Sequence, residues 1–202
     1  MVAAERLCPF AARALARGEV RIVAGPFDVE SCLERLAAEA DALARVGDPG
    51  AADVPTVLVA IAPGADGATA VDAFDDFLDL VALAEALLES LGHDGALQLA
   101  SFHPDYAFEG VPADDPANAT NRSPHPTLHL LRESAVASAV AAHPDPDGIP
   151  ARNAARLRAL GAGGVHRLLA RVDAPDGRRS SASLRPSLSP RSSPGTRGSR
   201  SP

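Results

Sequence analysis

Side chains suited to acid–base chemistry gather between residues 101 and 132. His103 and Asp105 lie two residues apart, and His129 follows later in the same segment. Imidazole and carboxyl groups are common general acids and bases, and a shared environment can tune their pKa values for that role. We therefore predict that these three residues form the acid–base group of a site.

An anion-binding group is predicted in the same segment. Ser123 precedes Pro124, a pair typical of a helix N-cap followed by proline at the first helical position. Asn121 and Arg122 would then meet the free amides of a helix N-terminus, where phosphate and carboxylate groups bind. Arg132 would supply a second guanidinium. The alternative is that Ser123 only caps the helix and that Arg122 only pairs with a neighbouring aspartate.

His125, His129 and Glu133 recur every four residues. On a helix this spacing places all three on one face, where they could chelate a divalent metal. The pattern is less specific than a complete HExxH motif, and His125 lies between two prolines. A divalent metal is therefore a secondary hypothesis, and no other cofactor is indicated.

Cys8 is a candidate nucleophile. A helix beginning at Pro9 would place Cys8 at its N-cap, where the helix dipole stabilises a thiolate. With His103 or His129 nearby, that thiolate could attack a substrate. The alternative is that Cys8 is a small buried residue, as we predict for Cys32, which lies on an apolar helical stripe. Two cysteines are too few for a disulfide scaffold or a cysteine-rich zinc site.

Alternating helices and strands must position these residues. Strands are predicted at 20–23, 54–61 and 96–101, and helices at 9–17, 29–43, 71–91, 124–141 and 150–160, with a last turn at 165–172. Helical crossovers between successive strands favour parallel pairing. We predict an α/β fold, a two-layer or three-layer sandwich with about three mainly parallel strands. A ferredoxin-like α+β sandwich is the alternative.

Composition limits the classes of function. The chain has 202 residues, a formal net charge of −7 and no lysine, which excludes lysine-dependent phosphate loops and Schiff-base chemistry. An acidic body is a poor binder of duplex nucleic acid or of a membrane surface. The N-terminus lacks a secretory apolar stretch, which favours a cytoplasmic location.

The last thirty residues differ in character from the rest. Residues 1–172 are predicted to form one α/β domain, whereas 173–202 consist mainly of Arg, Ser and Pro. Such a segment cannot bury enough apolar surface to offset the entropy of ordering, so we predict a disordered tail. Its six arginines would allow at most weak contacts with nucleic acid.

Several sequence blocks resemble a known family. They lie at 7–11 (LCPFA), 97–106 (LQLASFHPDY), 120–124 (TNRSP), 128–133 (LHLLRE), and 143–145 (HPD) with 148–150 (GIP). Over about residues 7–161, the chain resembles the bacterial proteins grouped as domain of unknown function 1415 (DUF1415). The family name implies no activity, substrate or catalytic residue. The tail lies outside the resemblance.

These observations favour a small-molecule enzyme or ligand-binding protein that acts on an anionic metabolite through the 101–132 segment. One alternative is a non-catalytic protein-interaction domain, which would expose Phe102, Tyr106 and Phe108 as a partner surface. Another is a redox or transferase enzyme that depends on Cys8. The enzyme interpretation requires the acid–base and anion-binding groups to converge on one pocket. Substrate, reaction type and oligomeric state are not predicted.

Overall fold

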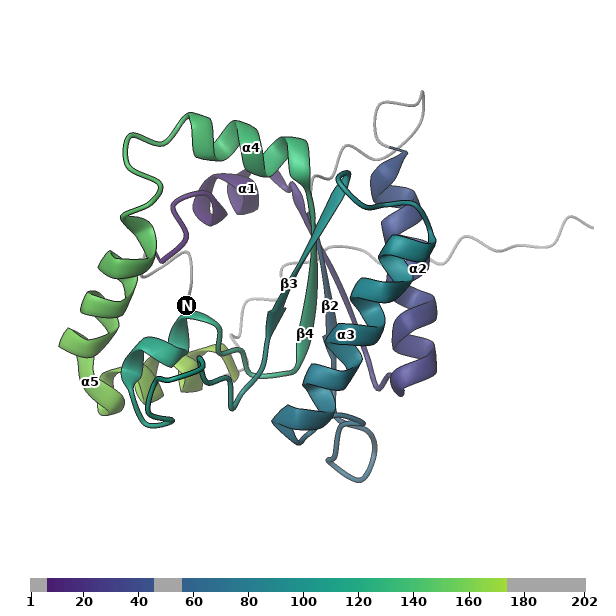
Figure 1. The fold of residues 1–202 in the computed structure, drawn as a ribbon. Helices are drawn as coiled ribbons and strands as arrows, with labels where there is room; N and C mark the ends of the chain where they lie inside the picture. Colours follow the sequence, from purple (N-terminus) through teal and green to yellow (C-terminus); the bar gives the residue numbers. More distant parts are fainter. Residues whose placement is uncertain (1–6, 46–55, 174–202) are drawn as a thin grey trace, which may run out of the picture.

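The computed structural model describes residues 7–45 and 56–173, which form a four-stranded sheet flanked by helices (Figure 1). None of the described helices is long and apolar enough to cross a membrane. In chain order the elements are α1 (Ala11–Arg17), β1 (Val20–Gly25), α2 (Val29–Ala44), β2 (Thr56–Ile61), α3 (Phe74–Ser90), β3 (Leu97–Phe102), the 3-10 helix η1 (Pro116–Thr120), β4 (Thr127–Arg132), α4 (Glu133–Ala141) and α5 (Ile149–Asp173).

The sheet is mixed and has the strand order β1-β2-β4-β3. β1 and β2 are parallel, and β4 runs antiparallel to both of its neighbours, β2 and β3. The three predicted strands therefore point the same way, which confirms the small α/β sheet, and β4 enlarges it by one strand. The element order differs from the βαββαβ order of a ferredoxin-like sandwich.

β4 replaces the first part of the helix predicted at 124–141, so that part of the prediction was wrong. Only Glu133–Ala141 is helical. Pro126 has no N–H to donate, and its ring disfavours helical backbone at the preceding His125. Leu128 and Leu130 then alternate into the core, as the period of a strand requires.

The other elements lie close to their predicted positions. α1 begins at Ala11 and its N-cap residue is Phe10, so the prediction that Cys8 caps this helix was wrong. α5 continues to Asp173, but Gly161 (φ 67°) interrupts it at the predicted helix end. Two predictions fall outside the described residues, namely the start of the second strand at 54–55 and the disorder of 174–202.

The main core lies between one face of the sheet and the helices α2 and α3. The Asp28 side chain accepts a hydrogen bond from the Ser31 amide (2.8 Å) and caps α2, which begins the helix at Val29. Each fully buried Leu or Phe side chain contributes roughly 1.5 to 3 kcal/mol. The buried residues of this core include Cys32 and Leu36 of α2, Val57, Val59 and Ile61 of β2, Phe77 and Leu80 of α3, and Leu128 and Leu130 of β4.

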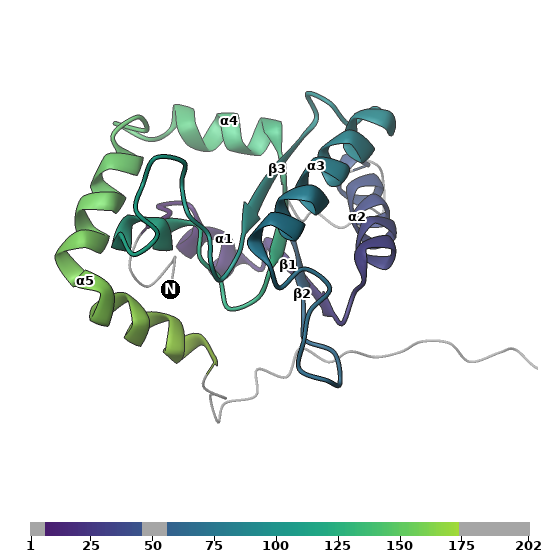
Figure 2. The ribbon, with the colours of Figure 1, turned by 60° about the horizontal axis from the view of Figure 1, so that its bottom comes forward.

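A second, smaller core lies on the opposite side of the sheet. It consists of Leu7, Ala119, Leu157 and Val165, and it joins α5 to η1 and the N-terminal segment. Asn153 donates a hydrogen bond to the carbonyl of Leu7 (2.6 Å), which ties that segment to α5. Figures 1 and 2 both place α1, α4 and α5 on this side, across the sheet from α2 and α3.

Candidate functional site

The sheet face opposite the main core forms a regular grid, which we call the second face. Alternation along each strand and the pairing register align its side chains in three rows of four. None of these side chains carries a formal charge, and His129 is the one ionisable group among them. The rows are Val20, Thr56, Leu131 and Gln98; Ile22, Leu58, His129 and Ala100; and Ala24, Ala60, Thr127 and Phe102.

The second face is only partly covered. Its middle is half-buried, and Ile22 at the β1 edge is 65% exposed. α1, α4 and α5 lie on this side of the sheet (Figures 1 and 2), yet neither α1 nor α4 contributes a buried residue. α1 and α4 therefore do not pack into the second face as α2 and α3 pack into the first.

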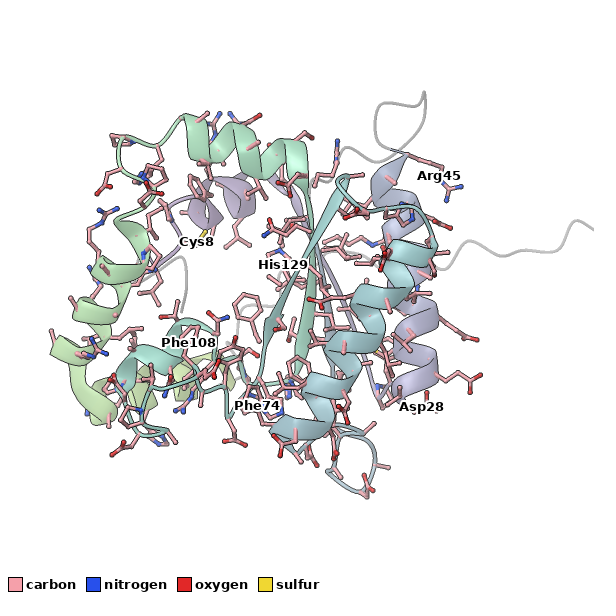
Figure 3. The ribbon with its side chains drawn as sticks, viewed as in Figure 1. Cys8, Asp28, Arg45, Phe74, Phe108 and His129 are labelled. Carbon is pink, nitrogen blue, oxygen red and sulfur yellow. The ribbon has the colours of Figure 1, made fainter. Side chains whose placement is uncertain are left out.

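His129 occupies the central row of the second face, on β4 (Figure 3). Burial lowers the pKa of its imidazole from 6.5 to about 4, because the charged form is poorly solvated there. The Phe102 ring lies at a centroid distance of 6.0 Å from the imidazole. At neutral pH His129 is therefore an uncharged group in a mainly apolar setting.

The contacts of Thr56 assign the tautomer of His129. The Thr56 hydroxyl donates a hydrogen bond to the carbonyl of Leu130 (3.0 Å), and its oxygen also lies against Nε2 of His129. Since the hydroxyl proton is committed to Leu130, we assign a proton to Nε2, which donates to Thr56. Nδ1 then keeps a lone pair, which has no hydrogen-bond partner among the described residues.

His103 has a different environment, on the side of α3. It is 1% exposed and packs against Phe74 and Phe77, with ring centroids 5.4 and 5.0 Å away. Its Nε2 donates to the carbonyl of Val71 (3.2 Å), and its Nδ1 accepts from the amide of Asp105 (3.1 Å). Both nitrogens are thus used within the fold, and His103 does not join His129 on the second face.

The predicted anion-binding residues hold the loop together instead of meeting a helix N-terminus. No helix begins at Pro124, so the prediction for Ser123 was wrong; its hydroxyl donates to the carbonyl of His125 (2.5 Å). Arg122 donates through Nε to the carbonyl of Tyr106 (3.0 Å) and through Nη2 to that of Ala113 (2.8 Å). The side chain of Asn121 donates to the carbonyl of Ser101 (3.4 Å).

Arg132 lies far from this group. It ends β4, five residues beyond Thr127, which corresponds to roughly 17 Å along a strand. Alternation also places it on the same face as Leu130, towards the main core. The two guanidinium groups of Arg122 and Arg132 therefore do not converge on one anion.

The chelation hypothesis for His125, His129 and Glu133 depended on a helix that is not there. Residues four apart on a strand are separated by roughly 13 Å, too far to share a metal ion. Throughout the described part of the chain, no three His, Cys, Asp or Glu side chains are grouped to hold a metal.

The two cysteines differ in access. Cys8 is half-buried, lies three residues before the start of α1, and is on the side of the sheet that carries the second face (Figure 3). Cys32 is fully buried in the main core, and burial, with a smaller contribution from the charge of Asp28, raises the pKa of its thiol to about 11. Cys32 is therefore a core residue, as predicted.

Sequence reasoning missed two polar residues that organise the site. Thr56 opens an apolar strand, and its hydroxyl orients His129. Asn118 is fully buried: its side-chain oxygen accepts from the Phe108 amide (3.1 Å), and its nitrogen donates to the carbonyls of Pro112 (2.8 Å) and Ala113 (3.3 Å). The sequence signal that could have indicated a buried Asn118 is its position between two alanines on η1.

Comparison with known families decides the relationship of the chain. The family model described as "Protein of unknown function (DUF1415)" matches residues 1–167. The chain belongs to the DUF1415 family. All four strands lie within the matched residues, so the second face belongs to the DUF1415 domain. The comparisons with curated proteins and with solved structures gave no match.

Proposed function

We propose that this DUF1415 protein binds a small molecule on its second face, with His129 as the central polar contact. The observation that carries the proposal is the lone pair of Nδ1, which has no partner among the described residues and lies in the middle of an uncharged, half-buried face. Nδ1 is not sealed inside the protein, so a ligand with a hydrogen-bond donor can reach it. A ligand on the second face would supply one. The site includes His129 and Phe102 of the predicted 101–132 segment.

The geometry supports binding better than acid–base catalysis. General acid–base catalysis is most effective when the pKa of the group lies near the working pH. The pKa of His129, about 4, makes its imidazole a weak base at neutral pH. His103 offers no second acid–base group, because its ring nitrogens are both hydrogen-bonded within the fold.

The surroundings also favour a small molecule over a protein partner. α1, α4 and α5 lie on the same side of the sheet as the second face (Figures 1 and 2). An interaction domain would expose the loop aromatics, but Phe102, Tyr106 and Phe108 are all half-buried.

A fragment screen by protein-observed NMR tests the proposal on the full chain with labelled Leu methyl and His ring groups. We expect bound fragments to shift the resonances of Leu58, Leu131 and His129 together. Ala100→Phe would fill the centre of the second face and should abolish binding. Ala82→Phe makes the same change on the exposed side of α3 and should leave binding intact.

Two results would overturn the proposal. One is that all bound fragments shift only resonances away from the second face. The other is that folded Ala100→Phe protein binds fragments as wild type does. Should Ala100→Phe fail to fold, His129→Leu provides the second variant, because the Thr56 hydroxyl keeps its acceptor on Leu130.

A further inference from the structure

We infer that the ligand of the second face is a neutral, largely apolar molecule that carries a hydroxyl or N–H group to donate to Nδ1 of His129. This inference rests on the proposed function and names the class of ligand. It differs from the anionic metabolite that the sequence favoured, because the arginines that were to hold an anion do not lie on this face.

The absence of charge on the second face argues against an anion. Charged residues make up 22% of the chain, yet none of the twelve second-face positions carries a formal charge. Arg21 of β1 points to the other side of the sheet and pairs with Glu39 (3.1 Å). A carboxylate or phosphate on the second face would lose part of its hydration without gaining a cation from the sheet, which disfavours its binding.

Away from the exposed Gln98 at the β3 edge, the hydrogen-bonding groups of the second face select a donor. Nδ1 of His129 is an acceptor, whereas the hydroxyls of Thr56 and Thr127 are already committed to the carbonyls of Leu130 and His125. The half-buried middle of the face therefore offers an acceptor but no spare hydroxyl proton. A hydroxyl or N–H group would donate a hydrogen bond to Nδ1, whereas the lone pairs of an ether or carboxylate oxygen would face the lone pair of Nδ1.

The remaining contacts select an apolar body. Leu58 and Ala100 flank His129 in the central row, and Leu131 follows it on the same face of β4. The Phe102 ring lies beside the imidazole, so a flat ring bound to Nδ1 could pack against it. A planar aromatic alcohol combines all of these features.

Three matched probes test the class of ligand: 2-naphthol, which donates; 2-methoxynaphthalene, which cannot donate; and 2-naphthoate, which is anionic. Their dissociation constants for the full chain are measured by calorimetry at pH 7. We expect 2-naphthol to bind about five- to tenfold more tightly than 2-methoxynaphthalene, the worth of one hydrogen bond. We expect 2-naphthoate to bind more weakly than either.

Two variants attribute the preference to His129. In His129→Leu the advantage of 2-naphthol over 2-methoxynaphthalene should disappear. In His166→Leu, the same change on the exposed surface of α5, the advantage should remain.

The outcomes separate the class of ligand from the site. Three results would overturn the ligand class. The first is that 2-naphthoate binds at least as tightly as 2-naphthol, and the second is that 2-naphthol does not bind. The third is that His129→Leu still prefers 2-naphthol to 2-methoxynaphthalene. If Ala100→Phe abolishes 2-naphthoate binding, the site stands and only the class is wrong. Probe binding that Ala100→Phe leaves unchanged would instead count against the proposed function itself.

Discussion

His103 and His129 have the same side chain but different uses in this fold. His103 has a partner on each ring nitrogen and is closed off by Phe74 and Phe77, so it fixes the start of the loop after β3. Within the described residues, His129 has a hydrogen-bond partner on Nε2 alone. The difference comes from the neighbours of each ring, and it is why we place His129, and not His103, in the proposed site.

The low pKa of His129 makes the stability of the fold depend on pH. The pKa is about 4 in the folded chain and about 6.5 when the side chain is solvated. Between these values the unfolded chain binds a proton that the folded chain does not, so the free energy of unfolding falls as pH drops from about 6.5 to about 4. The loss is at most about 3 kcal/mol. Above pH 7 this group contributes no pH dependence.

Urea unfolding of wild type and His129→Gln between pH 7.5 and pH 4 measures this dependence. Other groups titrate in both proteins, so the difference between the two curves isolates His129. We expect a steeper loss in wild type, and His166→Gln should behave like wild type. Parallel curves for wild type and His129→Gln would show that His129 is not buried in its neutral form.

The two thiols are expected to react at different rates with an aromatic disulfide reagent at pH 8. Cys32 is fully buried and protonated at this pH, whereas Cys8 is half-buried. One thiol should therefore react in the native protein and the second only after unfolding. Cys8→Ser should remove the native reaction and Cys32→Ala should leave it. A native reaction that survives Cys8→Ser would contradict this assignment.

At the scale of elements, apolar runs and turn residues predicted most of the fold. Three strands and the helices between them follow from periodicity and from residues such as Gly18 and Gly161. β4 was missed because Ser123-Pro124 was interpreted as a helix start and the spacing of His125, His129 and Glu133 as helical. The signals for a strand were Pro126 and the alternation Leu-His-Leu over 128–130, which only the pairing with β2 and β3 confirms.

The candidate site was predicted only in part, for the same reason. His129 and Phe102 lie in the segment that the sequence singled out, but their meeting with Thr56 depends on the register between β2 and β4. Their separation along the chain gives no local signal of this contact. The expected role of Arg122 failed because its two donors satisfy backbone carbonyls of the loop itself.

The loop between β3 and η1 depends on Asn118. Asn118→Ala would leave the loop amide of Phe108 without its acceptor and would remove one of the two donors to the carbonyl of Pro112, which keeps the Asp115 amide. We expect a loss of about 2 to 4 kcal/mol in the free energy of unfolding, measured with urea. Asn121→Ala removes one 3.4 Å contact and should cost less than about 1 kcal/mol. Equal losses would contradict this account of the loop.

The break in α5 requires the backbone conformation of Gly161, with φ 67° and ψ 170°, which residues other than glycine rarely adopt. A Cβ there would meet no other atom within 4 Å, so Gly161→Ala should destabilise by about 1 to 3 kcal/mol through backbone strain alone. Gly163→Ala, two residues later in helical backbone, should be neutral or stabilising by up to about 1 kcal/mol. Thermal unfolding of both variants makes the comparison. Equal destabilisation would show that Gly161 is helical.

At the scale of the whole molecule, the two faces of the sheet differ. One face is sealed by α2 and α3 into the main core, whereas the second core lies between α5, η1 and the N-terminal segment, with no residue of the sheet among its buried members. The second face thus lies beside the smaller core without being part of it. This separation leaves an uncharged, partly covered surface on the sheet, and this is the surface on which we propose that a small molecule binds.

Nitrogen NMR of the imidazole of His129, recorded with and without 2-naphthol at pH 7, tests the central claim most directly. The account predicts a neutral ring with its proton on Nε2, and a shift of the Nδ1 resonance when 2-naphthol donates a hydrogen bond to it, with little change at Nε2. A proton on Nδ1 in the free protein, or an Nδ1 resonance that stays unchanged when 2-naphthol saturates the protein, would contradict the claim that the second face binds its ligand through His129.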